Sequence, residues 1–444
     1  MKGGNVVQAE PRILVISHNV FSNSSAMGKT LVSMLSCVNK ENLAQLYFHS
    51  EIPTTNMCEN YLRIRDQDIL FSVITRNTRC RVFDSGDIKD TVKEIRTDTG
   101  LVSKIYQFSR KRTPPIYNAR NLMWKLGKWD TTDFWKWIND FSPDLIFFAS
   151  GDYAFSYKIT YEISRRLKIP IVMWCCDDFY IGKRHTNTLG GRYCYKNLMK
   201  WVKKISERVE SIVVISDKMK RDYGAIFTQP ISVVRISAPK NSKMLPKEER
   251  SGIVYVGGLG VNRIEPLLEL GRQLSRAKPG GYECIDVYSG DKNEHTLKLL
   301  VEENGIRFHG AADPEEVEKI LGRAKFILHV EAFDSVSKAR TAYSLSTKIG
   351  ESLRSGACIF AYGPLDISSI EYLKENGVAV ILESAEEFGQ KICHLIRNPD
   401  LYEKYVSKAQ ALADKNHSQE INNTVMAEIL HCHNITVSEK IAVL

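Results

Sequence analysis

The chain of 444 residues lacks any run of 18 uninterrupted apolar residues, so its sequence predicts no transmembrane helix. Residues 1–12 contain no apolar stretch of the kind found in secretory signal peptides, and we expect no such signal. The ten cysteines form no C-x-x-C pair, which disfavours a disulfide framework or a zinc site. We therefore expect free, mostly buried thiols in a reducing cytoplasm. The length predicts two or three domains.

Positive charge is concentrated in the first half of the chain. Residues 1–240 contain 37 Lys and Arg against 23 Asp and Glu, whereas the remaining residues contain 24 against 29. A basic half joined to an acidic half indicates that one half faces an anionic partner. Composition alone leaves nucleic acid, anionic lipid and a polyphosphate ligand open.

Short apolar stretches alternate with helical ones in the first half. Strands are expected at RILVIS (12–17), QLYFHS (45–50), DLIFFAS (144–150), IPIVMWCC (169–176), SIVVIS (211–216) and ISVVRIS (231–237). Stretches between them, such as 156–169, carry apolar residues at helical spacing. This alternation is typical of a doubly wound parallel sheet. The polar segment 237–252, rich in Ser, Lys and Pro, predicts a linker.

The same alternation starts again after this segment. Strands are expected at 252–260, 283–290, 306–310, 325–333, 358–363 and 378–382, and helices at 264–277, 295–305, 314–324, 347–356, 386–398 and 401–415. The chain thus predicts two α/β domains of similar size. Ligands of such sheets bind at the carboxyl ends of the strands, here in a cleft between the domains.

A glycine-rich loop, YVGGLGVNR, follows the first expected strand of the second half. Gly257, Gly258 and Gly260 would let backbone amides approach an anion at the start of the next helix. Arg263 could clamp a diphosphate with its planar guanidinium. Because Arg263 belongs to no apolar face, its removal is expected to leave folding intact. The alternative is a tight turn with a surface arginine.

A second phosphate-binding candidate is STKIGESLRSG, residues 346–356. Lys348 and Glu351 lie three residues apart, on one helical face. The helix start and Lys348 could hold phosphates, and Glu351 could accept hydrogen bonds from ribose hydroxyls. The alternative is an exposed ion pair of the common i,i+3 kind.

Four stretches together resemble a known family. They are SPDLIFFAS (142–150), ERVESIVVISDKMKRDYG (207–224), YVGGLGVNRIEPLLELGRQL (255–274) and LSTKIGESLRSGACIFAYGP (345–364). They are similar to retaining, family-4-like transferases of the glycosyltransferase-B fold that build bacterial capsule and other surface polysaccharides. The resemblance covers nearly the whole chain and is looser over 45–140.

The resemblance implies two Rossmann-like, doubly wound parallel-sheet domains facing a cleft. It places an acceptor-side domain at 1–240, a linker at 241–252, a donor-binding domain at 253–415 and a C-terminal helix or tail at 416–444. The donor-binding residues that it implies are Gly28, Gly257, Gly258, Arg263, Ser346, Thr347, Lys348 and Glu351.

The implied activity is transfer of a sugar, with retention, from a nucleotide diphosphate sugar to an acceptor, such as a lipid-linked oligosaccharide at the cytoplasmic face of the membrane. Arg263, Lys348 and loop amides would stabilise the departing diphosphate, with no metal or other cofactor. One departure stands out, because Tyr343 occupies the position of the first glutamate in the family's Glu-x7-Glu pattern. A sugar-nucleotide epimerase of the same fold and a non-catalytic glycan-binding scaffold remain alternatives.

The loop after the first strand, SHNVFSNSSAMGKT (17–30), is similar to a phosphate-binding P-loop. Gly28, Lys29 and Thr30 match that motif, but Asn23 stands where it needs its first glycine. The family resemblance instead places this loop under the donor diphosphate, where a side chain at Gly28 would crowd the donor or acceptor. A P-loop NTPase is the lesser alternative.

Acceptor-side candidates follow the strands of the first half. Asp152, Asp177 and Asp178 come directly after two expected strands, and neighbouring carboxylates suit a general base. Helix capping or an ion pair with Arg184 would explain them equally well. His18 ends the first strand, where it is either close to the reaction or a core group.

The stretch 110–138 contains seven basic and two acidic residues and four of the six tryptophans. Basic residues interleaved with tryptophan are typical of a segment that binds an anionic lipid surface. No nucleic-acid-binding module is recognisable in the chain. The alternative is a helix that packs its tryptophans into the domain.

Overall fold

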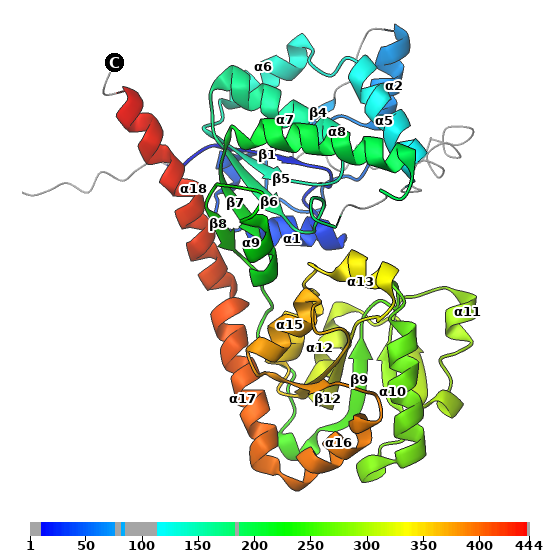
Figure 1. Cartoon of the computed structure of the whole chain (residues 1–444). Helices are drawn as coiled ribbons and strands as arrows, with labels where there is room; N and C mark the ends of the chain where they lie inside the picture. Colours follow the sequence, from blue (N-terminus) through cyan, green and yellow to red (C-terminus); the bar gives the residue numbers. More distant parts are fainter. Residues whose placement is uncertain (1–9, 76–80, 85–112, 183–185, 442–444) are drawn as a thin grey trace, which may run out of the picture. The chain divides into compact units, whose positions relative to one another are not determined.

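The computed structural model describes residues 10–75, 81–84, 113–182 and 186–441 (Figure 1). The chain forms two compact units. Unit 1 comprises Met1–Val214, Asp222–Val234 and Asn423–Leu444, and unit 2 comprises Ile215–Arg221 and Arg235–Asn422.

Unit 1 is built on an eight-stranded sheet of order β4-β3-β2-β1-β5-β6-β7-β8. All neighbouring strands pair in parallel except β3 and β4, which are antiparallel. The strands are β1 (Ile13–Ser17), β2 (Leu43–Tyr47), β3 (Asn60–Arg63), β4 (Arg81–Asp84), β5 (Leu145–Ala149), β6 (Ile171–Cys175), β7 (Val209–Val214) and β8 (Ile231–Val233). All six strands expected from the first half are confirmed, and β3 and β4 are additional.

The helices of unit 1 connect these strands and cover the sheet (Figure 1). They are α1 (Ala26–Met34), α2 (Asp66–Thr75), α5 (Pro114–Leu126), α6 (Thr132–Phe141), α7 (Ala154–Leu167) and α8 (Leu189–Ser206). The central strands are apolar and β-branched, and every residue of β1 is buried. Their side chains form a core with α1 and with Met426 and Leu430 of the last helix, α18 (Gln419–Ile441).

Unit 2 contains a fully parallel six-stranded sheet of order β11-β10-β9-β12-β13-β14. Its strands are β9 (Ser251–Val256), β10 (Ile285–Tyr288), β11 (Ile306–Gly310), β12 (Ala324–Val330), β13 (Cys358–Tyr362) and β14 (Ala379–Leu382). Its helices are α10 (Ile264–Ala277), α11 (Glu294–Leu297), α12 (Pro314–Arg323), α13 (Ser335–Thr341), α14 (Lys348–Arg354), α15 (Ser368–Glu375), α16 (Glu387–Arg397) and α17 (Pro399–Asn416), while α9 (Asp217–Tyr223) begins in this unit. Both sheets are of the expected doubly wound class.

The helix expected over 295–305 is wrong for most of its length. Only α11 and a 3-10 turn at Glu302–Asn304 form there. The Asn304 side chain donates to the carbonyl of Leu299 (2.9 Å), and the Gly305 amide donates to Glu302 (2.8 Å). These bonds satisfy the backbone in a turn, so a continuous helix is not needed.

The segment expected as a linker, 241–252, lies within unit 2 and is hydrogen-bonded to α12. Asn241 Nδ2 donates to the carbonyl of Glu318 (2.9 Å), and the Leu245 amide donates to the carbonyl of Gly322 (3.0 Å). Ser251 and Gly252 already belong to β9. Hydrogen bonds from the Asn241 side chain and the Leu245 backbone therefore attach the stretch to α12 despite its polar composition.

Candidate functional site

Unit 2 contains a pocket of about 380 Å³ at the carboxyl ends of β9 and β12. Its lining combines the end of β9, the glycine loop, the end of β12 and the start of α14. Six of the residues expected to bind the donor meet in it, namely Gly257, Gly258, Arg263, Ser346, Thr347 and Lys348. Its volume lies in the range of pockets that enclose small molecules.

The glycine loop leaves open space at the rim of this pocket. A Cβ atom added at Gly258 would meet nothing within 4 Å, and the Gly258 carbonyl accepts a hydrogen bond from Tyr255 Oη (2.7 Å). The Gly257 amide already donates to the carbonyl of Tyr288 (3.1 Å). Of these two predicted glycines, Gly258 is therefore the better placed to let a ligand approach the backbone.

The turn that follows holds two residues in the left-handed region. Val261 and Asn262 both have a φ of 56°, which is rare for any residue other than glycine and rarest for a β-branched one. Asn262 Nδ2 donates to Asp334 Oδ2 (3.1 Å), and Asp334 in turn caps α13 through the Ser337 amide (2.9 Å). Backbone in sparsely populated conformations is concentrated at binding sites, where surrounding contacts hold it in place.

Arg263 is held by a buried carboxylate, which the sequence analysis did not anticipate. Its Nε and Nη2 donate to the two carboxylate oxygens of Glu331, at 3.2 and 3.0 Å. The Glu331 side chain is only 3% exposed, whereas that of Arg263 is 21% exposed. Burial alone would lower the pKa of Arg263, but the Glu331 charge and hydrogen bonds raise it.

Glu331 is part of a wider network at the end of β12. Ser369 Oγ donates to Glu331 Oε1 (3.3 Å), and His329 Nε2 lies 3.6 Å from the same oxygen. Burial lowers the pKa of His329, so its ring is neutral at pH 7. The only signal in the sequence was the pair of polar residues, His329 and Glu331, within the otherwise apolar stretch KFILHVEAF.

Lys348 and Glu351 form the i,i+3 ion pair that the sequence indicated. Lys348 Nζ lies 2.8 Å from Glu351 Oε2, and the two side chains are 37% and 32% exposed. The Lys348 amide is bonded to Ser346 Oγ (3.3 Å). Both charged ends remain accessible to a ligand, so the ion-pair and ligand-binding interpretations are compatible.

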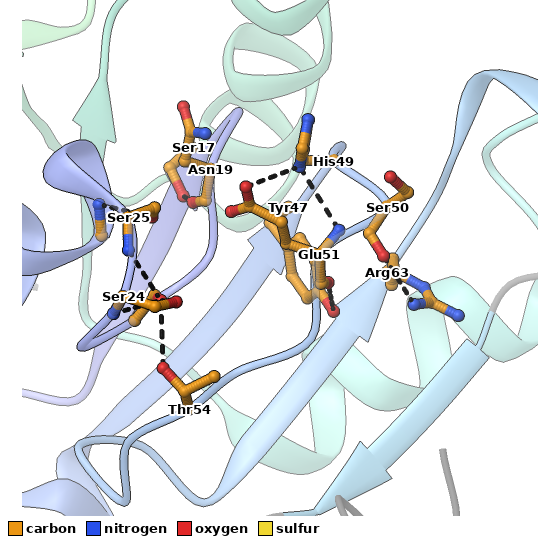
Figure 2. Close-up of polar contacts among 12 residues, drawn as sticks. Ser17, Asn19, Ser24, Ser25, Tyr47, His49, Ser50, Glu51, Thr54 and Arg63 are labelled. Carbon is orange, nitrogen blue, oxygen red and sulfur yellow. Dashed lines mark hydrogen bonds and ion pairs between the residues drawn. The ribbon is translucent and has the colours of Figure 1, made fainter. Parts of the chain in front are cut away.

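The loop between β1 and α1 uses its backbone amides within unit 1 (Figure 2). The Asn23 amide donates to Thr54 Oγ1 (2.8 Å), and the amides of Ser24 and Ser25 donate to Ser22 Oγ (3.1 and 3.3 Å). In a P-loop such amides would bind phosphate oxygens. Here these amides donate to serine and threonine hydroxyls where a P-loop would bind phosphate oxygens, which argues against the NTPase alternative.

Gly28 is required by packing within the loop. A Cβ atom at this position would lie 2.5 Å from Ser22 Cβ and 2.8 Å from the Ser22 amide nitrogen. Ser25 caps α1 by accepting from the Gly28 amide (3.3 Å). The expected reason for this glycine, room for donor or acceptor, is thus not needed to explain it.

Solved structures with a similar architecture share very little sequence with this chain. The Anabaena protein HepE in complex with UDP has a TM-score of 0.58 at 10% identity and covers 95% of this chain and 100% of its own. Sucrose-phosphate synthase from Thermosynechococcus elongatus has a TM-score of 0.56 at 12% identity, covering 96% and 99%. WaaG, a glycosyltransferase involved in lipopolysaccharide biosynthesis, has a TM-score of 0.54 at 11% identity, covering 94% and 99%.

The chain has the glycosyltransferase-B fold. A scan against protein-family models finds no match, and a search of curated proteins finds none either. The fold assignment therefore depends on the two parallel sheets and on full-length structural similarity. In glycosyltransferase-B terms, unit 1 corresponds to the N-terminal domain and unit 2 to the C-terminal domain.

Unit 1 of this glycosyltransferase-B fold carries a cluster of rings at the carboxyl ends of β1, β2 and β5. The His18 ring centroid lies 5.4 Å from that of His49 and 4.9 Å from that of Tyr153. Tyr117 Oη donates to Asp152 Oδ2 (2.5 Å) and its ring lies 5.5 Å from Tyr153. The structure therefore brings His18 and Asp152 into one cluster with three aromatic residues that the sequence analysis missed.

Asp177 and Asp178 hold the loop after β6. Asp178 Oδ1 accepts from the amides of Tyr180 and Ile181 (both 3.0 Å) and from Tyr223 Oη (3.0 Å). Its Oδ2 accepts from the Gly182 amide (2.6 Å), and the side chain is buried. Asp177 caps the amide of Asp178 (2.9 Å). This bonding favours a structural role in the loop over a general base, although no helix begins in the described part of this loop for the aspartates to cap. Arg184, the other partner considered, lies outside the described residues.

Most tryptophans of the stretch 110–138 are packed inside unit 1. Trp124 stacks on Phe155 at 4.0 Å and donates to Asp66 Oδ1 (2.7 Å). Trp129 and Trp137 are also buried, and Trp135 is half-buried with Arg166 Cζ 4.0 Å from its ring. The tryptophans therefore favour the alternative in which this stretch packs its aromatic side chains into the domain. Residues 110–112 lie outside the described part of the chain.

Two features are absent from the described residues. None of the helices there is both long and apolar enough to cross a membrane. Within the same residues no group of three or more His, Cys, Asp or Glu side chains is arranged to hold a metal ion. The described cysteines are all free thiols, of which Cys58, Cys175 and Cys358 are buried.

Proposed function

We propose that the chain is a retaining glycosyltransferase that transfers a sugar from a nucleotide diphosphate donor to a glycan acceptor. The observation that carries this proposal is the pocket of unit 2, which gathers the glycine loop, Arg263 and Lys348 at the carboxyl ends of two parallel strands. The complexes of HepE with UDP and with UDP-glucose support a nucleotide diphosphate sugar as donor.

The geometry of Arg263 fits a diphosphate clamp. Glu331 occupies the edge formed by Nε and Nη2, so the edge containing Nη1 can face an anion. Lys348 adds a partly exposed ammonium group from another lining segment, the start of α14. Both cations would stabilise the charge that develops on the departing diphosphate, and the scheme uses no metal. Glu351, paired with Lys348, would accept hydrogen bonds from the ribose hydroxyls.

The ring cluster of unit 1 supports an acceptor-side role for His18 and Asp152. Tyr153 and the two histidines offer flat faces at one edge of the sheet, and Arg120 Cζ lies 4.0 Å from the Tyr153 ring. Flat apolar faces next to a carboxylate and a guanidinium suit a sugar, which has both C–H and O–H groups.

The acceptor in this proposal is a lipid-linked oligosaccharide of surface-polysaccharide synthesis, such as a capsule, reached at the cytoplasmic face of the membrane. The role of WaaG in lipopolysaccharide biosynthesis supports this choice. The basic residues of 110–138 support attachment to an anionic membrane surface.

The test is release of free nucleoside diphosphate from a panel of nucleotide sugars, with and without a mixture of lipid-linked glycans. We expect one donor to stabilise the protein thermally and to release diphosphate when acceptor is present. Lys348→Ala should lower turnover by about 2–4 kcal/mol of transition-state stabilisation. Lys29→Ala, an exposed lysine in unit 1, is the matched control and should retain full turnover.

Other outcomes identify the rival functions. A sugar converted to its epimer without acceptor would indicate the epimerase. Glycan binding without any diphosphate release would indicate the scaffold.

A further inference from the structure

Helix α8 carries an unusual row of basic side chains along its outer face. Arg192, Lys196, Lys200 and Lys203 are spaced by four, four and three residues, which places them on one stripe of a helix, and all four are exposed. The helix contains no acidic residue between Leu189 and Ser206. Within the described part of the chain, none of the four forms an ion pair with a carboxylate.

The opposite face of α8 is fixed in unit 1. Leu198, Val202 and Ile205 are buried. The helix is also tied to α5, because Asn118 Nδ2 donates to the Gly190 carbonyl (3.1 Å) and Cys194 Sγ donates to Asn118 Oδ1 (2.8 Å). The basic stripe is therefore held outward by a rigid scaffold.

Large apolar side chains lie on the same stripe. Leu189 is 81% exposed and Tyr193 is 64% exposed. The helical position of Leu189 falls within the arc of the four basic residues, and that of Tyr193 lies just beyond Lys200 at the edge of this arc. On α5 the row that starts at Asn118 continues through Leu122 and Leu126, which are 55% and 63% exposed. We call the six residues Leu189, Arg192, Tyr193, Lys196, Lys200 and Lys203 the α8 stripe.

We propose that the α8 stripe docks unit 1 on an anionic lipid surface. Arg192 donates to the carbonyl of Thr186 (3.1 Å), but in the described residues neither it nor the three lysines has a carboxylate partner, so their charges fit such a surface. Exposed Leu189 and Tyr193 fit the boundary between headgroups and acyl chains. A nucleic-acid backbone would match the charges but would leave the leucine in water. The inference rests on the membrane association in the proposed function. It assigns the lipid-binding surface to α8 and not to the stretch 110–138, whose tryptophans are mostly buried.

The experiment is co-sedimentation of the full chain with vesicles of phosphatidylcholine, with or without phosphatidylglycerol. We expect binding only to the anionic vesicles, and binding that salt weakens. Each basic residue near an anionic surface contributes roughly five-fold in affinity, so replacing the four basic residues of the α8 stripe by alanine should lower vesicle affinity by roughly 600-fold.

A matched control removes the same charge elsewhere. Lys374, Lys404, Lys408 and Lys415 are exposed on α15 and α17 of unit 2, and replacing all four by alanine should change vesicle affinity by no more than a few fold. The pair Leu189→Ser and Tyr193→Ser should weaken the binding that persists at high salt. Donor-induced thermal stabilisation should stay unchanged in every variant, which separates this surface from the donor site.

Three results would overturn the proposal. One is absence of binding to either vesicle, including the case in which the α8 stripe binds DNA or an acidic protein instead. Another is an equal loss of affinity in the α8 and control variants. The third is a loss of vesicle affinity in the triple variant Lys125→Ala, Lys128→Ala and Lys136→Ala while the α8 variant binds normally. This result would assign the lipid-binding surface to the stretch 110–138.

Discussion

Breaking the pair of Arg263 and Glu331 should destabilise unit 2, although sequence alone predicts no effect on folding. Arg263→Ala leaves a carboxylate that is 3% exposed with Ser369 Oγ, at 3.3 Å, as its remaining side-chain hydrogen-bond donor in the described residues. Removing one partner of a buried ion pair costs about 3–5 kcal/mol. Because the Arg263 side chain is 21% exposed, water can take over part of its hydrogen bonding to Glu331 in the variant. We therefore expect a loss in the free energy of unfolding at the lower end of this range, about 3 kcal/mol.

Two further variants show whether the charges themselves cause the loss. Glu331→Gln keeps the shape and one acceptor oxygen, so it should cost about 1–2 kcal/mol. The double variant Arg263→Ala with Glu331→Gln removes both charges, and its loss of stability should be smaller than the sum of the two single losses.

The distribution of tryptophan allows the two units to be followed separately. All six tryptophans lie in unit 1, so their fluorescence reports unfolding of unit 1 only. Urea unfolding followed by circular dichroism should show an earlier transition for Arg263→Ala, while the tryptophan transition stays at the wild-type urea concentration. If both transitions coincide with those of the wild type, the pair does not stabilise unit 2 and this reasoning is refuted.

Three other predictions concern single positions. Gly28→Ala should destabilise unit 1 by about 1–3 kcal/mol, measured by tryptophan fluorescence, because its Cβ would overlap Ser22; unchanged stability would contradict the packing explanation. Lys29→Ala should leave nucleoside diphosphate affinity unchanged in titrations, and magnesium-dependent ATP binding that this variant abolishes would restore the NTPase. Burial lowers the pKa of His417 to about 4, so below pH 6.5 the unfolded chain binds a proton that the folded chain does not. The free energy of unfolding should therefore fall by up to about 1.4 kcal/mol per pH unit as the pH drops from 6.5 towards 4. His417→Gln should flatten that dependence in urea titrations across this pH range, and an unchanged slope would assign it to other groups.

The sequence pattern predicted every strand of the sheet in unit 2, and all those described in unit 1 except β3 and β4. Runs such as ILVI (13–16) and CIFAY (358–362) show no alternation with charged residues because parallel strands are covered on both faces, and both lie in fully buried strands. The strand β4 is an edge strand and β3 is its neighbour. Each has only four residues and includes polar ones, so the pattern did not reveal them.

The sequence also determined which loops line the pocket of unit 2, because residues that follow parallel strands come to the same edge of a sheet. The glycine loop, Arg263 and Lys348 could be named from their positions after strands. What only the tertiary structure decided is what each side chain touches. Glu331, 68 residues beyond Arg263, binds its guanidinium, and no local pattern encodes such a contact.

Burial was the second property that only the tertiary structure decided. A helix that packs its aromatic residues into the core and a helix that exposes them can have the same basic and aromatic composition, since both are amphipathic. Composition alone therefore does not tell the two apart. In the folded chain Trp124 lies against Phe155 within unit 1, whereas Lys196 and Tyr193 of α8 face solvent. Which face of a helix meets the core depends on the elements packed against it, and these come from distant parts of the chain.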